Sequence, residues 1–282
     1  MKLFQPTADV FIPDGARPDA ALKRITHLGI GAHQDDLEFM AFHGILECFG
    51  KSDAWFGGVT CTNGAGSPRA GVYATCTDEQ MRAIRRDEQR AAATVGRYGA
   101  MIQLDHPSSI VKAAAHPAVK NDLLEILRAT QPRVVYTHNP ADKHETHIAV
   151  VGATIAALRA LPPAEQPERV LGCEIWRDLD WLPDARKVLL DVSDRQHLAA
   201  ALNGVFDSQI AGGKRYDAAV QGRRRAHATF FESHGVDAAE MLTFAMDLTP
   251  LLKNPALSLA DFTGGLLDEL KTEVMGKLLP WK

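Results

Sequence analysis

The chain has 282 residues, of which 46% are hydrophobic and 23% charged, and its formal net charge at pH 7 is -4. This length and composition are typical of a globular protein with one large core, and the mildly negative charge argues against a general attraction to the phosphates of nucleic acids. The four cysteines include no CxxC pair, and the sequence shows no signal-peptide pattern. No apolar run reaches the about 20 residues that cross a bilayer. We therefore expect a cytoplasmic protein with reduced thiols and no membrane span.

Short strand-like runs alternate along the chain with longer segments of helical periodicity. The predicted strands are residues 25–32, 54–61, 100–104, 133–138, 169–176 and 187–192. The predicted helices are residues 37–50, 78–99, 116–130 and 144–161. The alternation predicts an α/β fold with a Rossmann-like, mostly parallel sheet and helices on both faces. We expect a single domain over residues 1–282, with a core at about 22–235 and a C-terminal helical extension at about 236–282.

Two of the predicted strands end in clusters of acids and histidines. The stretch GAHQDDLEFM ends the first strand and contains His33, Asp35, Asp36 and Glu38; the stretch HNPADKHETH ends strand 133–138 and contains His138, Asp142, His144 and His147. Ligands of open α/β sheets bind beyond the carboxyl ends of the strands, where the winding order reverses. If these two strands are neighbours in the sheet, both clusters meet at that point.

The residue types in the two clusters are those of a catalytic zinc site. Such a site needs about three nitrogen or carboxylate ligands and an open position for water, and His33, Asp36 and His147 supply that set. Asp35 lies next to a ligand and is free to act as the general base that takes the proton of the water. His144 lies three residues before His147, on the same side of a helical turn, where it can assist the oxyanion or the leaving nitrogen.

Each cluster also has a simpler explanation. Asp35 and Asp36 precede a predicted helix, where acids commonly cap free N–H groups. The stretch HETH is one residue short of the HExxH spacing of zinc proteases. The presence of both clusters at two predicted strand ends favours a metal site, although spacing alone leaves a binding protein without catalysis open.

At these residues the sequence resembles the PIG-L or LmbE-like family of zinc-dependent de-N-acetylases. AHQDDLE is similar to the family's AHPDDxE, TNGAG to its Thr-x-Gly loop, and MRAIRRDEQRAAATVG to its Arg-x-x-Glu helix. THNPADKHETHIAV resembles its zinc-histidine region, DVSDRQHLAAALNGVFDSQ its late helix, and GRRRAHATFFE, more loosely, a segment near its C-terminus. The resemblance implies the same roles as the chemistry: zinc on His33, Asp36 and His147, the general base at Asp35, and oxyanion or leaving-group assistance by His144.

The sequence departs from the family pattern at several positions near the expected site. Gln34 replaces a proline, and we expect this change to be silent. Thr146 replaces an aspartate, which we expect to alter how His144 is oriented or charged. Larger residues stand where many members have small ones and are expected to reshape the pocket: Met40, Phe42 and His43.

Four further features lie outside the two clusters. Arg85 and Glu88, three residues apart on a predicted helix, predict a structural ion pair. The arginines at 223–225 are expected to form a solvated face, with the alternative that one of them reaches an acidic substrate. Trp176, Asp178 and Trp181 either pack at a strand end or offer a platform for a sugar ring. The stretches AAEMLTFAMDL and FTGGLLDELKTEVMGKLL are amphipathic, and they either pack on the domain or mediate a homo-oligomer.

These observations together predict a zinc hydrolase that removes an N-acyl group, most plausibly acetyl, from an amino sugar or its conjugate. Its expected partner is a small N-acetylated amino sugar such as a glucosamine derivative, with no nucleic acid and no membrane span. The alternatives are a metal-dependent hydrolase of another bond, such as a phosphoester, and a sugar-binding module without catalysis. A divalent metal other than zinc and a homo-oligomer remain open.

Overall fold

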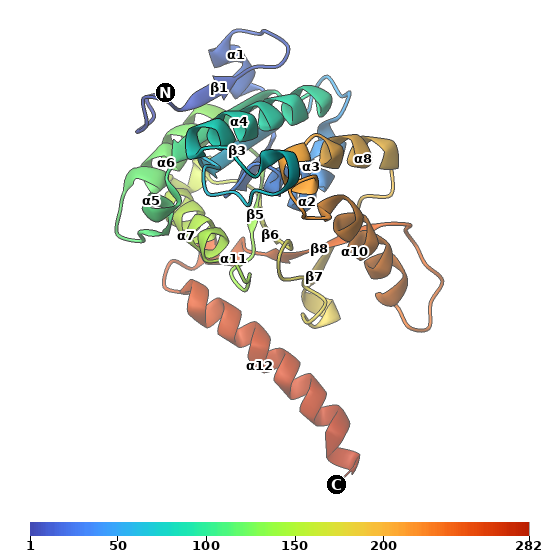
Figure 1. Ribbon diagram of the computed structural model, residues 1–282. Coiled ribbons are helices and arrows are strands. Elements are labelled where there is room, and N and C mark those ends of the chain that lie inside the picture. Colours follow the sequence, from blue (N-terminus) through green and yellow to red (C-terminus); the bar gives the residue numbers. More distant parts are fainter. Residues whose placement is uncertain (282) are drawn as a thin grey trace.

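A computed structural model describes residues 1–281. Its framework is an eight-stranded sheet in the order β1-β4-β3-β2-β5-β6-β8-β7 (Figure 1). The strands are β1 (Asp9–Phe11), β2 (His27–Gly31), β3 (Phe56–Thr62), β4 (Ala100–His106), β5 (Val134–His138), β6 (Arg169–Cys173), β7 (Lys187–Asp191) and β8 (Leu242–Asp247). The central strands from β4 to β6 run parallel, whereas β1 and β8 pair antiparallel with their neighbours. The predicted mostly parallel α/β sheet is therefore confirmed.

Helices cover both faces of the sheet, and each face has its own hydrophobic core. One core includes residues of α5 (Ser108–Lys112), α6 (Ala118–Thr130), α7 (Glu145–Arg159) and α11 (Pro250–Lys253). The other includes residues of α2 (Asp36–Met40), α3 (Phe42–Cys48), α4 (Asp78–Val95) and α8 (Gln196–Gly204). The remaining α-helices are α1 (Pro18–Lys23), α9 (Asp207–Ile210), α10 (Tyr216–Phe230) and α12 (Leu259–Leu278). Short 3-10 helices occupy Gly71–Tyr73, Pro163–Glu165, Asp184–Arg186 and Leu279–Trp281.

Large side chains alternate with glycines along β2, and the glycines let α2 lie close to the sheet. Leu28 and Ile30 point into the first core, while Gly29 and Gly31 face the other side of the sheet. A Cβ atom on Gly31 would lie only 3.0 Å from Cβ of Asp36, at the start of α2. The glycine therefore allows the acid cluster to sit directly on the end of the strand.

The segment from 236 onward differs from the helical extension that we expected. Residues Leu242–Asp247 form β8, which pairs antiparallel with both β6 and β7 and separates them in the sheet. Most of β8 is buried, and an apolar run this short does not distinguish a strand from a helix by periodicity. Helical structure in this segment is confined to α11, α12 and the 3-10 turn that follows.

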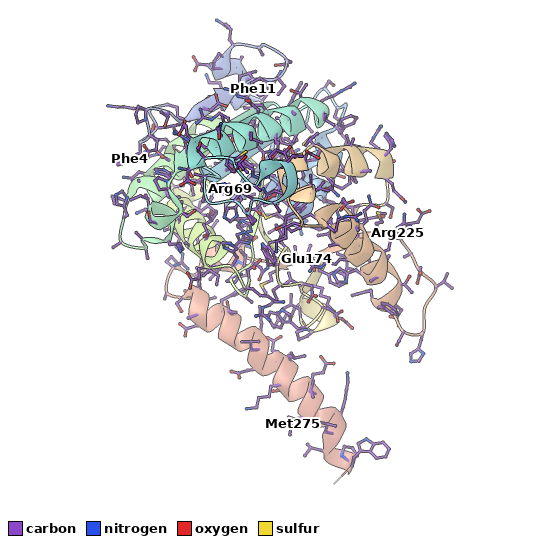
Figure 2. All side chains as sticks on the ribbon, viewed as in Figure 1. Phe4, Phe11, Arg69, Glu174, Arg225 and Met275 are labelled. Carbon is purple, nitrogen blue, oxygen red and sulfur yellow. The ribbon has the colours of Figure 1, made fainter. Side chains whose placement is uncertain are left out.

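The last long helix projects from the body of the molecule. Figure 1 shows α12 running outward to the C-terminal end, and Met275 lies on its projecting part in Figure 2. Leu266, nearer the start of α12, is buried in the first core, whereas residues 271–281 are exposed. Within residues 1–281, no helix combines the length and the apolar character needed to cross a membrane.

Candidate metal and catalytic site

The two polar clusters meet because β2 and β5 are neighbours. These strands pair in parallel, with Ile30 opposite Thr137, so their carboxyl ends lie side by side. This is the arrangement on which the expected site depended. The segment after β2 supplies His33, Asp35 and Asp36, and the segment after β5 supplies His144 and His147.

Three of these side chains form a compact triangle of possible metal ligands. Nδ1 of His33 lies 3.2 Å from Nε2 of His147 and 3.3 Å from Oδ2 of Asp36. Nε2 of His147 lies 3.5 Å from Oδ1 of Asp36. Ligands about 2.0–2.1 Å from a tetrahedral zinc are separated by about 3.3 Å, so the donor spacing fits this ion.

Among residues 1–281, two groups of side chains could hold a metal ion, and His147 belongs to both. One group contains His33, His144 and His147, and the other contains Asp36, His138 and His147. Because both groups use His147, they describe one centre and not two. Nε2 of His138 already accepts a hydrogen bond from the backbone N–H of Ala32 at 2.9 Å, which engages the lone pair that a metal would need.

Asp36 is held as an anion and does not cap its helix. Its Oδ2 accepts hydrogen bonds from the backbone N–H groups of Ala32 (2.9 Å) and His33 (2.6 Å). Burial alone would raise the pKa of Asp36, but the neighbouring histidines, His147 foremost, hold it well below its usual value. Neither Asp35 nor Asp36 uses its side chain to cap α2, so the simple capping explanation is wrong for this pair.

His147 is buried and held in its neutral form. Burial lowers its pKa to about 4, and the nearby His138 ring, stacked at 3.8 Å between centroids, acts in the same direction. Its Nδ1 atom faces the Asp142 carboxylate at 3.4 Å. A carboxylate in this place fixes the orientation of the imidazole and increases its basicity as a ligand. We had placed Asp142 in the cluster without assigning it this role.

Asp35 occupies a strained backbone position beside the triangle. Its φ angle is 101°, in the left-handed region that non-glycine residues rarely adopt. The side-chain oxygen of Gln89 accepts its backbone N–H at 3.1 Å, and the Arg85 guanidinium donates to its carboxylate at 2.8 Å. Burial raises the pKa of Asp35 to about 6, against the opposing effect of Arg85. Strain and two buried partners together hold this carboxylate in one place.

The ion pair predicted between Arg85 and Glu88 is present at 3.2 Å, but Arg85 does more than pair with its helix neighbour. It also donates to the carbonyl oxygen of Gln34 and to Asp35, so α4 is tied to the segment after β2. Glu88 in turn accepts the backbone N–H of Ser208 at 2.6 Å. A helix that sequence reasoning treated as structural therefore positions the expected base.

His144 is oriented by backbone groups at the start of α7. Its Nδ1 accepts the N–H of Thr146 at 3.2 Å, while its own backbone N–H donates to Asp142 at 3.1 Å. Because Nδ1 accepts, the neutral imidazole carries its hydrogen on Nε2. Burial and the nearby His33 lower the pKa of His144, which favours this neutral form. Thr146, which replaces the family's aspartate, thus contributes its backbone to the orientation of His144.

The structure adds contacts at one residue around the site and corrects the expectation for another group. The buried amide of Gln34 donates to the carbonyl oxygen of Thr62 at 3.0 Å and to Gln103 at 3.3 Å, and the silence of this replacement stays a prediction. The arginines at 223–225 do not form a solvated face, since Arg224 is 2% exposed and donates to the carbonyl oxygens at the end of α2. Three consecutive arginines do not indicate that one of them is buried, because packing decides which face of a helix is covered.

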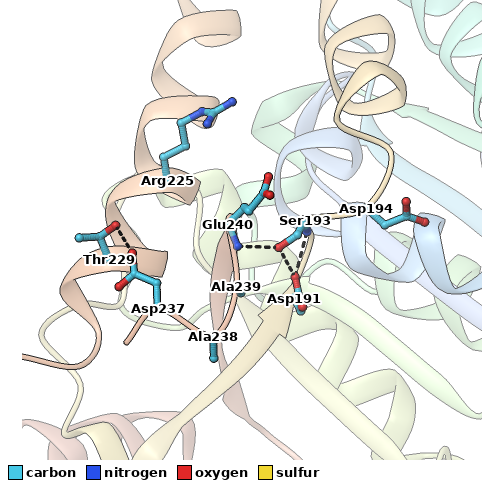
Figure 3. Close-up of a pocket in the computed structure, with 9 residues that line it drawn as sticks. All are labelled: Asp191, Ser193, Asp194, Arg225, Thr229, Asp237, Ala238, Ala239 and Glu240. Atoms are coloured by element: carbon cyan, nitrogen blue, oxygen red, sulfur yellow. Dashed lines mark hydrogen bonds between the residues drawn. The ribbon is translucent and has the colours of Figure 1, made fainter. Parts of the chain in front are cut away.

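A cavity of about 660 Å³ lies away from the cluster, between the ends of β7 and α10 (Figure 3). It is lined in part by Asp191, Ser193, Arg225, Asp237 and Glu240, and it shares no residue with the metal triangle. Several of its polar groups pair with one another, as in the bond from Ser193 Oγ to Asp191 at 2.5 Å and that from Thr229 to Asp237 at 2.9 Å. The candidate site is therefore the histidine and aspartate cluster.

Fold and cluster together define an α/β protein with one site suited to a metal ion at the carboxyl ends of its central strands. Residues 28–158 match the PIG-L family, described as GlcNAc-PI de-N-acetylase. The matched range includes both clusters of the site, and the match agrees with the resemblance that the sequence motifs predicted. No curated protein matches the chain significantly.

Solved structures share the fold at low sequence identity. The conserved protein TT1542 from Thermus thermophilus has a TM-score of 0.61 and 19% identity, over 82% of this chain and 98% of that one. The N,N'-diacetylchitobiose deacetylase from Pyrococcus horikoshii has a TM-score of 0.60 and 17% identity, over 81% and 85%. GalB, the 4-carboxy-2-hydroxymuconate hydratase from Pseudomonas putida, has a TM-score of 0.56 and 18% identity, over 79% and 96%. At such identities the likeness shows the fold, and function must be argued from the site.

Proposed function

We propose that this protein is a zinc-dependent hydrolase that removes an N-acetyl group from an amino sugar or an amino-sugar conjugate. The observation that carries the proposal is the triangle of His33, Asp36 and His147, with Asp35 beside it and a hydrogen of His144 available on Nε2. The family match of residues 28–158 supports the same reaction class. His33, Asp36 and His147 would hold the ion.

A zinc ion held by His33, Asp36 and His147 would supply a water molecule of lowered pKa and would polarise the carbonyl group of the amide. Asp35 accepts the proton that the attacking water loses as the new C–O bond forms. His144 donates a hydrogen bond from Nε2 to the oxyanion that develops on the amide oxygen. When the C–N bond breaks, the proton held by Asp35 passes to the leaving nitrogen, which departs as the amine and leaves acetate. Arg85 holds the Asp35 carboxylate, and Gln89 holds the backbone N–H of the same residue.

The alternatives have less support from the site. A hydrolase of phosphoesters that uses two metal ions holds the ions about 3.5–4 Å apart, whereas both groups found among residues 1–281 share His147 and so describe a single centre. A binding protein has no use for a strained, doubly supported carboxylate beside its ligands, as at Asp35. One structure with the same fold is a hydratase, so the test must measure release of acetate directly.

The test compares wild-type protein with His147→Ala and with His234→Ala, an exposed histidine outside the cluster that serves as the matched control. Elemental analysis of zinc-loaded protein measures metal per chain, and acetate release is followed on a panel of N-acetylated amino sugars. We expect about one zinc per chain in wild type and in His234→Ala, and loss of both metal and turnover in His147→Ala. Absence of zinc in the wild type would overturn the metal site, and zinc without acetate release would overturn the deacetylase reaction.

A further inference from the structure

Trp176 lies near His144 and is partly exposed, although the loop that carries it is held by several hydrogen bonds. Its ring centroid lies 6.4 Å from that of His144, and 38% of the residue is exposed. The backbone N–H of Trp176 donates to Asp142 at 3.3 Å, and the next residue, Arg177, donates from Nε to the carbonyl oxygen of Ala141 at 2.6 Å. The loop is thus fixed to the segment that also orients His144 and His147.

The buried carboxylate of Glu174 stabilises the same loop through hydrogen bonds. Oε2 of Glu174 accepts the backbone N–H of Leu179 at 3.0 Å and lies 2.9 Å from a ring nitrogen of His227. Figure 2 shows Glu174 within the body of the protein and not on its outline. Arg223 adds a bond to the carbonyl oxygen of Ile175. Exposure of the indole is therefore a property of a rigid loop and not of a loose one.

Two residues near the start of α10 complete a rim around the indole. The ring of Tyr216 meets Trp176 edge to face, with 6.0 Å between centroids, and also packs against Phe39 at 5.4 Å. Nζ of Lys214 lies over the indole ring, 5.3 Å from its centroid, in a cation–π contact. Lys214 is half-buried and has no salt-bridge partner among residues 1–281. The indole of Trp176 and the ammonium group of Lys214 therefore lie together near His144.

We propose that Trp176, Tyr216 and Lys214 form a subsite for the part of the substrate that does not react, taking a sugar ring on the indole and an anionic substituent beside the ammonium group. The proposal rests on the deacetylase function for the reacting end and names the substrate class, an acidic conjugate of an N-acetylated amino sugar. A sugar ring has an apolar C–H face that an exposed indole can cover. A phosphate or a carboxylate would supply the charge that Lys214 lacks.

The test uses three probes that share the N-acetylglucosamine ring: the neutral methyl glycoside, the carboxymethyl glycoside and the 1-phosphate. With zinc-loaded wild type, we expect kcat/KM for acetate release to be about 3- to 10-fold higher for an anionic probe than for the neutral one. The two anionic probes distinguish a carboxylate from a phosphate as the preferred group. The preference should shrink as ionic strength rises, because salt screens a half-exposed charge pair.

Variants assign the preference to individual side chains. Lys214→Gln should remove the preference through KM with kcat nearly unchanged, Lys214→Arg should retain it, and Lys120→Gln, an exposed lysine on α6, should resemble wild type. Trp176→Ala should lower kcat/KM for all three probes by about 2- to 10-fold, and Trp176→Phe should restore most of the loss. Trp281→Ala, at the exposed end of the chain, is the matched control. An anionic preference that survives in Lys214→Gln, or a Trp176→Ala variant equal to its control, would overturn the subsite.

A second measurement separates this inference from the proposed reaction. Calorimetry with glucosamine 1-phosphate and with glucosamine reports binding without turnover. If the wild type releases no acetate from any probe but binds the phosphate in a Lys214-dependent manner, the deacetylase function fails and the subsite stands. If acetate is released and neither variant changes binding or KM, the function stands and the subsite is refuted. If the wild type shows neither turnover nor binding, both the deacetylase function and the subsite are refuted.

Discussion

The Asp142 carboxylate lies 3.4 Å from Nδ1 of His147 and accepts the backbone N–H of His144 with its other oxygen. One buried acid thus sets the orientation of a proposed metal ligand and of the proposed oxyanion donor. The pKa of Asp142 would be raised by burial, but its contact with His147 and the backbone bond from His144 hold it below its usual value. The acid is therefore ionised at neutral pH and available to hold both histidines.

The first prediction concerns this relationship. Asp142→Asn keeps the size of the side chain but removes the charge that faces His147, so zinc affinity should fall by about 10- to 100-fold. Competition with a chromogenic chelator measures the affinity, and circular dichroism checks that the variant is folded. Wild-type affinity in a folded Asp142→Asn protein would show that Asp142 does not support the metal.

The second prediction concerns Asp35 as the base. Asp35→Asn should retain zinc and lower kcat by at least about 100-fold, because no other carboxylate is held at that position to take the proton. Asp53→Asn, an exposed aspartate, is the control and should keep full activity. Zinc content and acetate release are measured on the same preparations. Comparable turnover in both variants would remove Asp35 from the mechanism.

The third prediction is the acid limb of the pH profile. Asp35 acts only when ionised, and burial raises its pKa to about 6. Activity should therefore be present above that pH and fall as the pH drops through it. The positive charge of a bound metal ion stabilises the carboxylate, so in the loaded enzyme the limb should lie at about 6 or lower. The dependence of log kcat/KM on pH tests this, and an acid limb well above that pKa would identify a different group.

The fourth prediction tests His144. Its neutral ring offers a hydrogen on Nε2 because Nδ1 accepts the N–H of Thr146. His144→Ala should lower kcat by about 100- to 1,000-fold, the usual effect of removing an oxyanion donor, while zinc binding is retained. His197→Ala, a histidine on α8 outside the cluster, is the control. Loss of the metal in His144→Ala would instead place this residue among the ligands.

The fifth prediction concerns stability. Arg85 is 1% exposed and pairs with two buried carboxylates, Asp35 and Glu88. Arg85→Ala leaves both without their cation and should lower the free energy of unfolding by about 3–5 kcal/mol. Arg128→Ala removes an exposed arginine that pairs with Glu125 at the same three-residue spacing, and it should cost less than about 1 kcal/mol. Urea unfolding of both variants measures the difference, and equal losses would contradict the structural role of Arg85.

The sequence by itself determined the central elements and the candidate residues of the site. Periodicity located the central strands and the helices α4, α6 and α7, because a helical stripe and a buried strand leave local patterns in the chain. The residue types after the strands that became β2 and β5 identified His33, Asp36 and His147 as candidate ligands, and their proximity followed once those strands proved to be neighbours. The family resemblance rested on the same local motifs.

Only the tertiary structure decided what depends on contacts between distant segments. The insertion of β8 between β6 and β7 joins residues far apart in the chain, and a short apolar run does not specify its partners. The burial of Arg224, the contact of Asp142 with His147, and the bond from Arg85 to Asp35 likewise depend on which side chains packing brings together. The physical reason is that local sequence sets backbone preference, whereas burial and charge pairing are set by the whole fold.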